Sequence, residues 1–266
     1  MVRRGYWFGL WAVVALLIPS STLAQELHKA AAEGNEKLIK TRLKDGDDID
    51  GQDKKGNTPL LVALNHNQSG AANLLIQNDA DVNIKNDDGD TALLIVLRKK
   101  MNNMAVDLIA DYDADVDARN KAGETPLYIA LFQNNDSQVL DELINAKPGI
   151  VAGTAPNGES LLIFALKNNR PDIASQLIDE GANVKVTTKD RNQDTPLSLA
   201  VKNHPKNKRA YQTVIETLIK VKKVDPNAPN GSGQTPLALA QNDDKLSKYL
   251  KDNGAKEPDT EDEQEN

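Results

Sequence analysis

The chain has 266 residues, with 39 acidic and 32 basic side chains and a formal net charge of −7. This moderately acidic balance argues against nucleic acid or an anionic membrane surface as a partner. The chain contains no cysteine, which excludes a disulfide framework, a thiolate zinc site and a cysteine nucleophile.

The N-terminal segment has the order of a secretory signal. Two arginines and an apolar run over residues 6–18 precede small side chains that end at Ala24. The thirteen residues of the run would form a helix of roughly 20 Å, shorter than the roughly 30 Å of bilayer hydrocarbon. We therefore predict a signal peptide over residues 1–24, cleaved after Ala24. The alternative is an uncleaved anchor that extends to Leu23.

Export would place the mature chain outside the cytoplasm. Removal of residues 1–24 takes away two arginines and changes the formal net charge from −7 to −9. An exported chain with no cysteine and no second hydrophobic segment fits a bacterial periplasm better than a eukaryotic secretory route. The predicted location is the periplasm, with no stable membrane insertion after cleavage. Secretion from the cell and anchoring in the inner membrane are the alternatives.

Beyond this segment, a tripeptide recurs at a nearly regular interval, and four of its six copies read Thr-Pro-Leu. Its copies begin at Thr58, Thr91, Thr125, Ser160, Thr195 and Thr235, which are 33, 34, 35, 35 and 40 residues apart. A period of this length is typical of proteins whose units bury their apolar faces only against neighbouring units. The sequence therefore predicts an all-α solenoid of six helix-turn-helix repeats, joined by β-hairpin turns and preceded by a cap. Function is expected on an extended surface.

The third unit illustrates the local pattern. A turn is predicted over residues 120–124, in which Gly123 takes a positive φ. Thr125 is the expected N-cap of a first helix, and Pro126 is its first residue, where a missing N–H costs nothing. Apolar residues then recur at helical spacing. After a loop at residues 134–136, a second amphipathic helix completes an antiparallel pair.

With these motifs the chain resembles the ankyrin-repeat proteins. Their units combine a tight hairpin, a helix start Thr-Pro-Leu-His-x-Ala, and a second helix that ends in Gly-Ala-x-Val-Asn. The resemblance covers about residues 26–256. The histidine of the motif is replaced by Leu61, Leu94, Tyr128, Ile163, Ser198 and Ala238. Because the resemblance assigns hydrogen bonds between units to that histidine, we expect a less rigid stack.

The predicted organisation is an ankyrin-repeat domain over residues 25–256, followed by an acidic, disordered tail over residues 257–266. The cap is predicted at 25–51 and the repeats at 52–85, 86–119, 120–154, 155–189, 190–229 and 230–256. The fifth repeat is irregular, because Gln193 replaces the turn glycine and the inter-helix segment over residues 203–209 is long and basic. Such a segment is either a loop on a functional face or simple drift.

No residue pattern indicates catalysis, a cofactor or a metal. His28, His66 and His204 each lack a second histidine at ligand spacing. The acid-rich turns at residues 45–48 and 87–90 lack the ligand spacing of a calcium loop. No phosphate-binding glycine loop is present. We therefore expect a chain that is not an enzyme and that has no cofactor or metal.

The resemblance implies that the hairpin tips and the outward side of each first helix form a concave surface that binds a partner protein. Carried onto this sequence, that surface contains Lys54, Lys55, His66, Asp87, Asp88, Asp90, Arg98, Lys99, Lys121, Glu124, Tyr128, Phe132, Gln133, Glu159, Lys167, Arg191 and Lys202. Its alternating charges suit a protein of mixed charge more than a polyanion. Phe132, joined by Tyr128, is the candidate anchor. The alternative is that both rings pack against the adjacent hairpin.

The resemblance therefore implies a non-catalytic protein-binding module, with another protein as partner. Within the periplasm, we expect an inhibitor or immunity-type protein for a toxin, or an accessory protein of an envelope enzyme; the residues do not separate these roles. The alternative is a secreted effector that binds host proteins.

Overall fold

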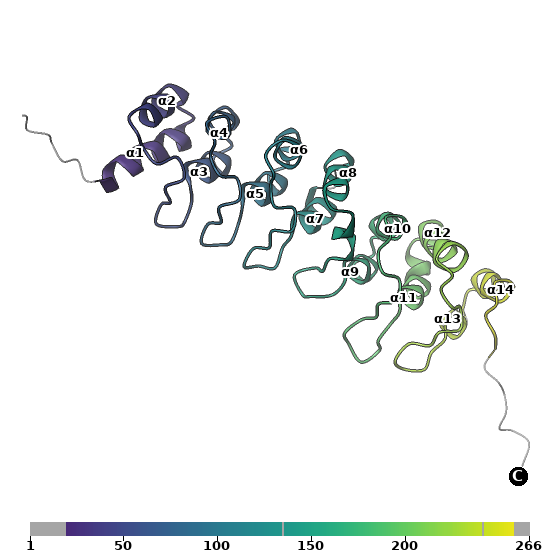
Figure 1. Cartoon of the computed structure of the whole chain (residues 1–266). Helices are drawn as coiled ribbons and strands as arrows, with labels where there is room; N and C mark the ends of the chain where they lie inside the picture. The colour runs from purple at the N-terminus through teal and green to yellow at the C-terminus, as the bar shows by residue number, and fades with distance from the viewer. Residues whose placement is uncertain (1–19, 135, 241, 258–266) are drawn as a thin grey trace, which may run out of the picture. The chain divides into compact units, whose positions relative to one another are not determined.

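The computed structural model describes residues 20–134, 136–240 and 242–257. The chain divides between Asp81 and Val82 into two compact units. Figure 1 shows helices and long turns. No strand is formed within the described ranges, where one isolated antiparallel bridge joins Thr154 and Ser160. The apolar run of the predicted signal peptide and residues 258–266 of the predicted tail lie outside the described residues.

The first unit contains two helical pairs. Its helices are α1 (Ser20–Glu33), α2 (Glu36–Lys44), α3 (Pro59–Asn65) and α4 (Ser69–Ile76). Helix α1 packs on α3 and α2 on α4, so that Leu27, Ile39 and Leu60 are buried between them. The predicted cap is therefore a helical pair that buries its apolar face against the first repeat.

The second unit continues with five helical pairs. Their first helices are α5 (Ala92–Arg98), α7 (Pro126–Ile129) with the π-helix η1 (Ala130–Asn134), α9 (Leu161–Lys167), α11 (Pro196–Asn203) and α13 (Pro236–Leu239). Their second helices are α6 (Asn102–Ala110), α8 (Ser137–Ala146), α10 (Pro171–Asp179), α12 (Lys208–Glu216) and α14 (Asp244–Asp252). The 3₁₀ helices η2 (Pro148–Ala152) and η3 (His204–Lys206) and the π-helix η4 (Thr217–Val221) complete this unit.

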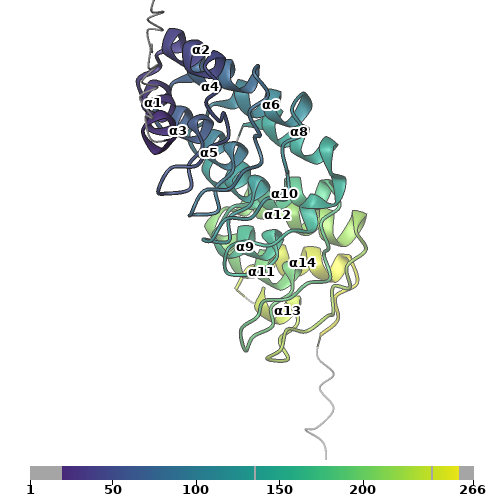
Figure 2. The same cartoon turned by 60° about the vertical axis from the view of Figure 1, so that its left-hand side comes forward.

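First helices pack on first helices in the second unit, and second helices pack on second helices. The contacts join α5 to α7, α9 to α11, α6 to α8 and α10 to α12, and α9 and α11 lie side by side in both Figure 1 and Figure 2. Their apolar side chains form the core of the unit, in which Leu93, Leu127 and Leu161 are at most 1% exposed. Each pair is thus stabilised by its neighbours.

The predicted helix caps and turn glycines are confirmed. Each predicted N-cap hydroxyl accepts a hydrogen bond from the backbone N–H three residues later, at Thr58, Thr91, Thr125, Ser160, Thr195 and Thr235. Glycines 56, 89, 123, 158 and 233 have φ between 72° and 83°. Gln193 takes the equivalent position with φ 41°. Two backbone hydrogen bonds close each turn, as from the Asn120 N–H to the Glu124 carbonyl at 3.2 Å and from the Gly123 N–H to the Asn120 carbonyl at 3.0 Å.

Two predicted inter-helix segments are helical in part. The first helix of the third repeat extends as η1 to Asn134. In the fifth repeat, α11 continues to Asn203, and η3 continues to Lys206. Asn203 donates from its side-chain amide to the Leu166 carbonyl at 2.8 Å, and His204 is 5% exposed. These two side chains pack inward, so the segment is held as helix.

Candidate functional site

Three aromatic side chains meet on the first helices of the third and fourth repeats. Tyr128 on α7 lies 5.3 Å from Phe132 on η1 and 5.7 Å from Phe164 on α9, measured between ring centroids. The rings of Phe132 and Phe164 are 5.0 Å apart and nearly perpendicular. All three side chains are half-buried. We call Tyr128, Phe132 and Phe164 the aromatic patch.

Sequence analysis identified two members of this patch and missed Phe164. The missed signal is spacing, because Phe164 follows Phe132 by about one repeat length and therefore lies on the neighbouring first helix. The alternative interpretation placed both rings against the adjacent hairpin. The ring contacts join Tyr128 and Phe132 to each other and to the next first helix, and packing against the hairpin stays an alternative.

The π-helix that carries Phe132 accommodates one extra residue. Ser137 at the start of α8 lies twelve residues after the cap Thr125, whereas Pro171 at the start of α10 lies eleven residues after Ser160. A single wide turn absorbs such an insertion without breaking the helix, and π-helical turns of this kind are frequent at functional sites.

Beside the patch, carboxylates are paired with side chains eight or nine residues further along the chain. In three repeats a cation follows a buried carboxylate by eight residues: Asp90–Arg98 at 3.0 Å, Glu159–Lys167 at 2.8 Å and Asp194–Lys202 at 2.6 Å. In the third repeat the extra residue changes the register. Gln133 therefore donates to Glu124 at 2.8 Å in place of a cation. Phe132 occupies the position eight residues after Glu124 and belongs to the aromatic patch.

These pairs also connect neighbouring repeats. Arg98 donates to Glu124 of the next repeat at 2.9 Å, and Asn120 donates to Asp90 at 2.9 Å. Burial opposes ionisation of Glu124, but hydrogen bonds from Asn120, Arg98 and Gln133 outweigh it and hold the pKa of this carboxyl below its usual value. Many predicted surface residues thus bond to one another.

The remaining predicted surface residues lie on turns or helix ends. In the first unit, Lys54 and Lys55 are exposed on a turn, and His66 at the end of α3 places Nδ1 3.0 Å from the carbonyl oxygen of Val62. In the second unit, the exposed turn residues are Asp87, Asp88, Lys121 and Arg191, and Lys99 is half-buried at the end of α5. Their contact with a partner stays a prediction.

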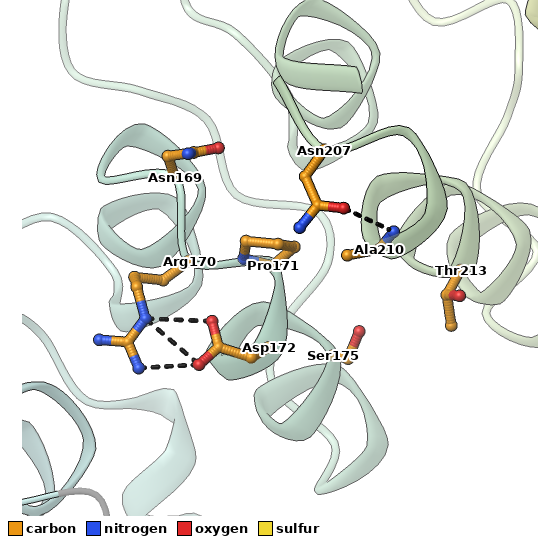
Figure 3. Close-up of a pocket in the computed structure, with 8 residues that line it drawn as sticks. All are labelled: Asn169, Arg170, Pro171, Asp172, Ser175, Asn207, Ala210 and Thr213. Carbon is orange, nitrogen blue, oxygen red and sulfur yellow. Dashed lines mark hydrogen bonds and ion pairs between the residues drawn. The ribbon is translucent and has the colours of Figure 1, made fainter. Parts of the chain in front are cut away.

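A separate hollow of about 480 Å³ lies between the starts of α10 and α12 (Figure 3). It is lined by Asn169, Arg170, Pro171, Asp172, Ser175, Asn207, Ala210 and Thr213. Its charged side chains are Arg170 and Asp172, which are joined to each other at 2.8 Å. The lining therefore presents amides and hydroxyls without a charged group left over for acid–base chemistry.

The described residues hold neither a group of metal ligands nor a membrane-spanning helix. Among them, no three histidine, cysteine or acidic side chains are grouped so that they could hold a metal ion. In the same part of the chain, every helix is too short or too polar to span a membrane.

The stacked helical pairs, their Thr-Pro caps and their glycine turns define a helical-repeat protein with its candidate site on the first helices. The family model described as ankyrin repeats matches three times, over residues 13–86, 65–150 and 130–209. The chain belongs to the ankyrin-repeat family. It is therefore a protein–protein interaction module, and the family points to a non-catalytic role.

Solved structures show the same fold. The ankyrin repeat domain of Bcl-3, a member of the IkappaB protein family, superimposes with a TM-score of 0.67 at 23% identity, over 85% of this chain and 97% of that one. The human ASB11 ankyrin repeat domain gives a TM-score of 0.60 at 20% identity, over 87% of this chain and 99% of that one.

Curated relatives match over shorter stretches. Human protein phosphatase 1 regulatory subunit 27 is 39% identical over 77 residues, which are 29% of this chain and 49% of the relative. An ankyrin repeat-containing protein of Schizosaccharomyces pombe is 29% identical over 75 residues, 28% of this chain and 36% of the relative. The chain thus spans less than half the length of these relatives.

Proposed function

We propose that this chain binds a partner protein at the aromatic patch and acts on that partner without catalysis of its own. The observation that carries the proposal is the contact of three half-buried rings from two neighbouring first helices. Clustered aromatic side chains supply a large apolar area at low entropic cost, and they are enriched among residues that dominate binding energy.

The polar residues around the patch support this choice of centre. Asp90, Glu159 and Asp194 are buried and already hydrogen-bonded within the chain. Groups that are satisfied internally gain little from a new partner, whereas covering the rings removes apolar surface from water. We infer that the rings provide affinity and that the paired charges hold the two helices in position.

We further propose that the partner is an envelope enzyme or toxin of the bacterial periplasm, which this chain inhibits or assists. The signal-like order of residues 1–24 supports export. A distant relative is named as a regulatory subunit of a phosphatase, which is in keeping with action on an enzyme. A secreted effector that binds host proteins is the alternative, favoured by the same N-terminal segment, and it predicts the chain in the culture medium.

The test is affinity capture with the full chain carrying a C-terminal tag, expressed in the source cells. Phe132→Ala is compared with Tyr112→Ala, which truncates a ring that is 39% exposed after the end of α6. We expect one stoichiometric partner on the unsubstituted chain and on Tyr112→Ala. Phe132→Ala should weaken its binding by about fivefold or more, which corresponds to about 1 kcal/mol.

Loss of ring packing must be separated from loss of binding. Phe132 contacts two other rings, and each aromatic pair contributes about 0.5–1.5 kcal/mol, so Phe132→Ala should also lower stability. Phe132→Leu retains most of the apolar volume and serves as the second variant. Equal partner affinity for both Phe132 variants and the unsubstituted chain, with folding checked by circular dichroism, would remove the patch from the binding site.

A further inference from the structure

The charges beside the aromatic patch form two clusters in which two carboxylates share one cation. In the first, the Arg98 guanidinium lies 3.0 Å from Asp90 and 2.9 Å from Glu124. In the second, the Lys167 ammonium lies 2.8 Å from Glu159 and 3.8 Å from Asp190. Each cluster therefore has one negative charge in excess. We call these six residues the acidic rim.

The acidic rim borders the aromatic patch on both first helices. Lys167 follows Phe164 by three residues on α9, and this spacing places neighbours on one helix face. Glu124 lies in the turn, two residues before the first residue of α7. Burial, aided by the negative charge of Glu124, raises the pKa of Tyr128 above its usual value. The negative charge of the rim therefore acts on the ionisation of a side chain in the aromatic patch.

The carboxylates of the rim retain capacity for further donors. Glu124 accepts from Arg98 and Asn120 through Oε2 and from Gln133 through Oε1. Asp190, whose side chain is 48% exposed, accepts from Thr188 and Asn192 through Oδ1. A carboxylate offers about four acceptor sites, so both side chains can accept at least one more hydrogen bond from a partner.

Covering the rings would also remove water from the rim. An uncompensated charge is costly when it loses water, and a second carboxylate brought close adds repulsion. A lysine or arginine of the partner does the opposite, because it neutralises the excess charge and can also lie over a ring face. The rim therefore favours a cationic segment over the mixed charge expected from the sequence.

The arrangement of the rings further limits the occupant. Their centroids are 5.0–5.7 Å apart, so the rings contact one another and leave no space for a group between them. The patch is a surface on which a side chain lies, and not a cage that encloses a cation.

We propose that the aromatic patch and acidic rim bind a basic segment of the partner protein, with one aromatic or large aliphatic side chain on the rings and lysines or arginines on either side. This inference rests on the proposed function, because it names the chemistry of the partner at the same site. The apolar side chain supplies buried area, and the flanking cations are paired by Glu124 and Asp190.

The test uses random 12-residue peptides displayed on phage. They are selected on the full chain and counter-selected on Phe132→Ala, so that only peptides dependent on the patch are enriched. We expect enriched peptides with one aromatic or large aliphatic residue flanked by at least two lysines or arginines. Fluorescence anisotropy then measures the affinity of an enriched peptide.

Charge dependence is measured with a matched pair of variants. Asp190→Asn removes one rim charge and keeps an oxygen that can accept from Thr188 and Asn192. Asp179→Asn removes the same charge from the exposed end of α10. We expect Asp190→Asn to weaken the basic peptide about two- to threefold and Asp179→Asn to leave it unchanged. An increase from 50 to 500 mM NaCl should weaken it several-fold.

Each result decides between the two proposals. Enriched peptides that depend on Phe132 but are neutral or acidic would overturn the basic-segment inference and leave the binding site standing. Equal affinities at low and high salt, or equal effects of the two aspartate variants, would overturn the same inference. Selection that yields no peptide dependent on Phe132 would overturn both the inference and the proposed binding site.

Discussion

Single side chains are closely packed in the core of this stack. Among the described residues, Tyr211 on α12 is the largest side chain that is fully buried, at 0% exposed. Its hydroxyl forms no hydrogen bond of normal geometry within this part of the chain, although the side chain of Asn203 lies near enough to lower the pKa of Tyr211. Burial, with a smaller contribution from the negative charge of Asp172, raises the pKa of Tyr211 to about 12. Ionisation of this one hydroxyl therefore links the stability of the fifth repeat to pH in the alkaline range.

We predict that Tyr211→Phe is neutral or stabilising at pH 7 and protects the chain at high pH. The phenol has a folded pKa above its unfolded value of about 10. Its contribution is therefore complete below pH 10 and is lost as pH rises toward 12, by about 2–3 kcal/mol at most. Removal of an unpaired buried hydroxyl costs little at pH 7.

Urea unfolding at pH 7, 10 and 11 tests this prediction. Tyr112→Phe, at a position that is 39% exposed, is the control and should follow the unsubstituted chain at every pH. A loss of more than about 1 kcal/mol for Tyr211→Phe at pH 7 would show that the hydroxyl makes a stabilising hydrogen bond.

Local elements depend on contacts that cross from a turn to the helix that follows. Asp194, immediately before the cap of α11, is 4% exposed. It accepts from Lys202 at 2.6 Å and from Asn230 of the next repeat at 2.8 Å. One carboxylate therefore joins its own turn, its own helix and the neighbouring turn.

We predict that Lys202→Met destabilises the chain by about 2 kcal/mol. The substitution leaves a buried carboxylate without its cation, which costs about 3–5 kcal/mol for a fully buried pair; the lysine side chain is 29% exposed, which lowers the cost. Urea midpoints of the single variants and of Lys202→Met with Asp194→Asn form a double-mutant cycle. Additive losses would show that the pair contributes nothing. Lys245→Met, at an exposed position on α14, controls for loss of charge.

The helices and turns were predicted from the sequence better than the connections between the helices. Thr125 and Gly123 were sufficient to locate a turn and a helix start, because an N-cap hydroxyl and a positive φ are local requirements. The π-helix η1 was predicted in part as a loop. In the sequence, one extra residue can belong either to a wider helical turn or to a longer loop. Only the buried neighbours of the helix decide between these two.

At the scale of the whole molecule, the period of the Thr-Pro-Leu copies was enough to predict the fold, since each unit needs neighbours to bury its apolar face. The site was predicted less completely. Tyr128 and Phe132 were identified, but Phe164 was not, because its contact crosses from one repeat to the next. The pairing of Arg98 with Asp90 and Glu124 also depends on contacts between a helix and two turns, which spacing along the chain does not reveal.

The N-terminal segment leads to a prediction about the whole chain. Cleavage after Ala24 would remove the first five residues of α1 and leave Leu27, Ala30 and Ala31, which are at most 1% exposed. The cap would therefore keep its packing on α3. We predict that the full chain with a C-terminal tag, expressed in a bacterium, is recovered from the osmotic-shock fraction with Gln25 as its first residue. Intact mass measures the cleavage site.

Ala24→Arg is the control variant, because a large charged side chain at the cleavage site blocks a signal peptidase that needs small residues there. It should accumulate as the uncleaved chain in the membrane fraction. Recovery of the unsubstituted chain uncleaved in membranes would support the anchor that extends to Leu23. Its recovery uncleaved in the cytoplasm would contradict export, and the partner would then have to be sought among cytoplasmic proteins.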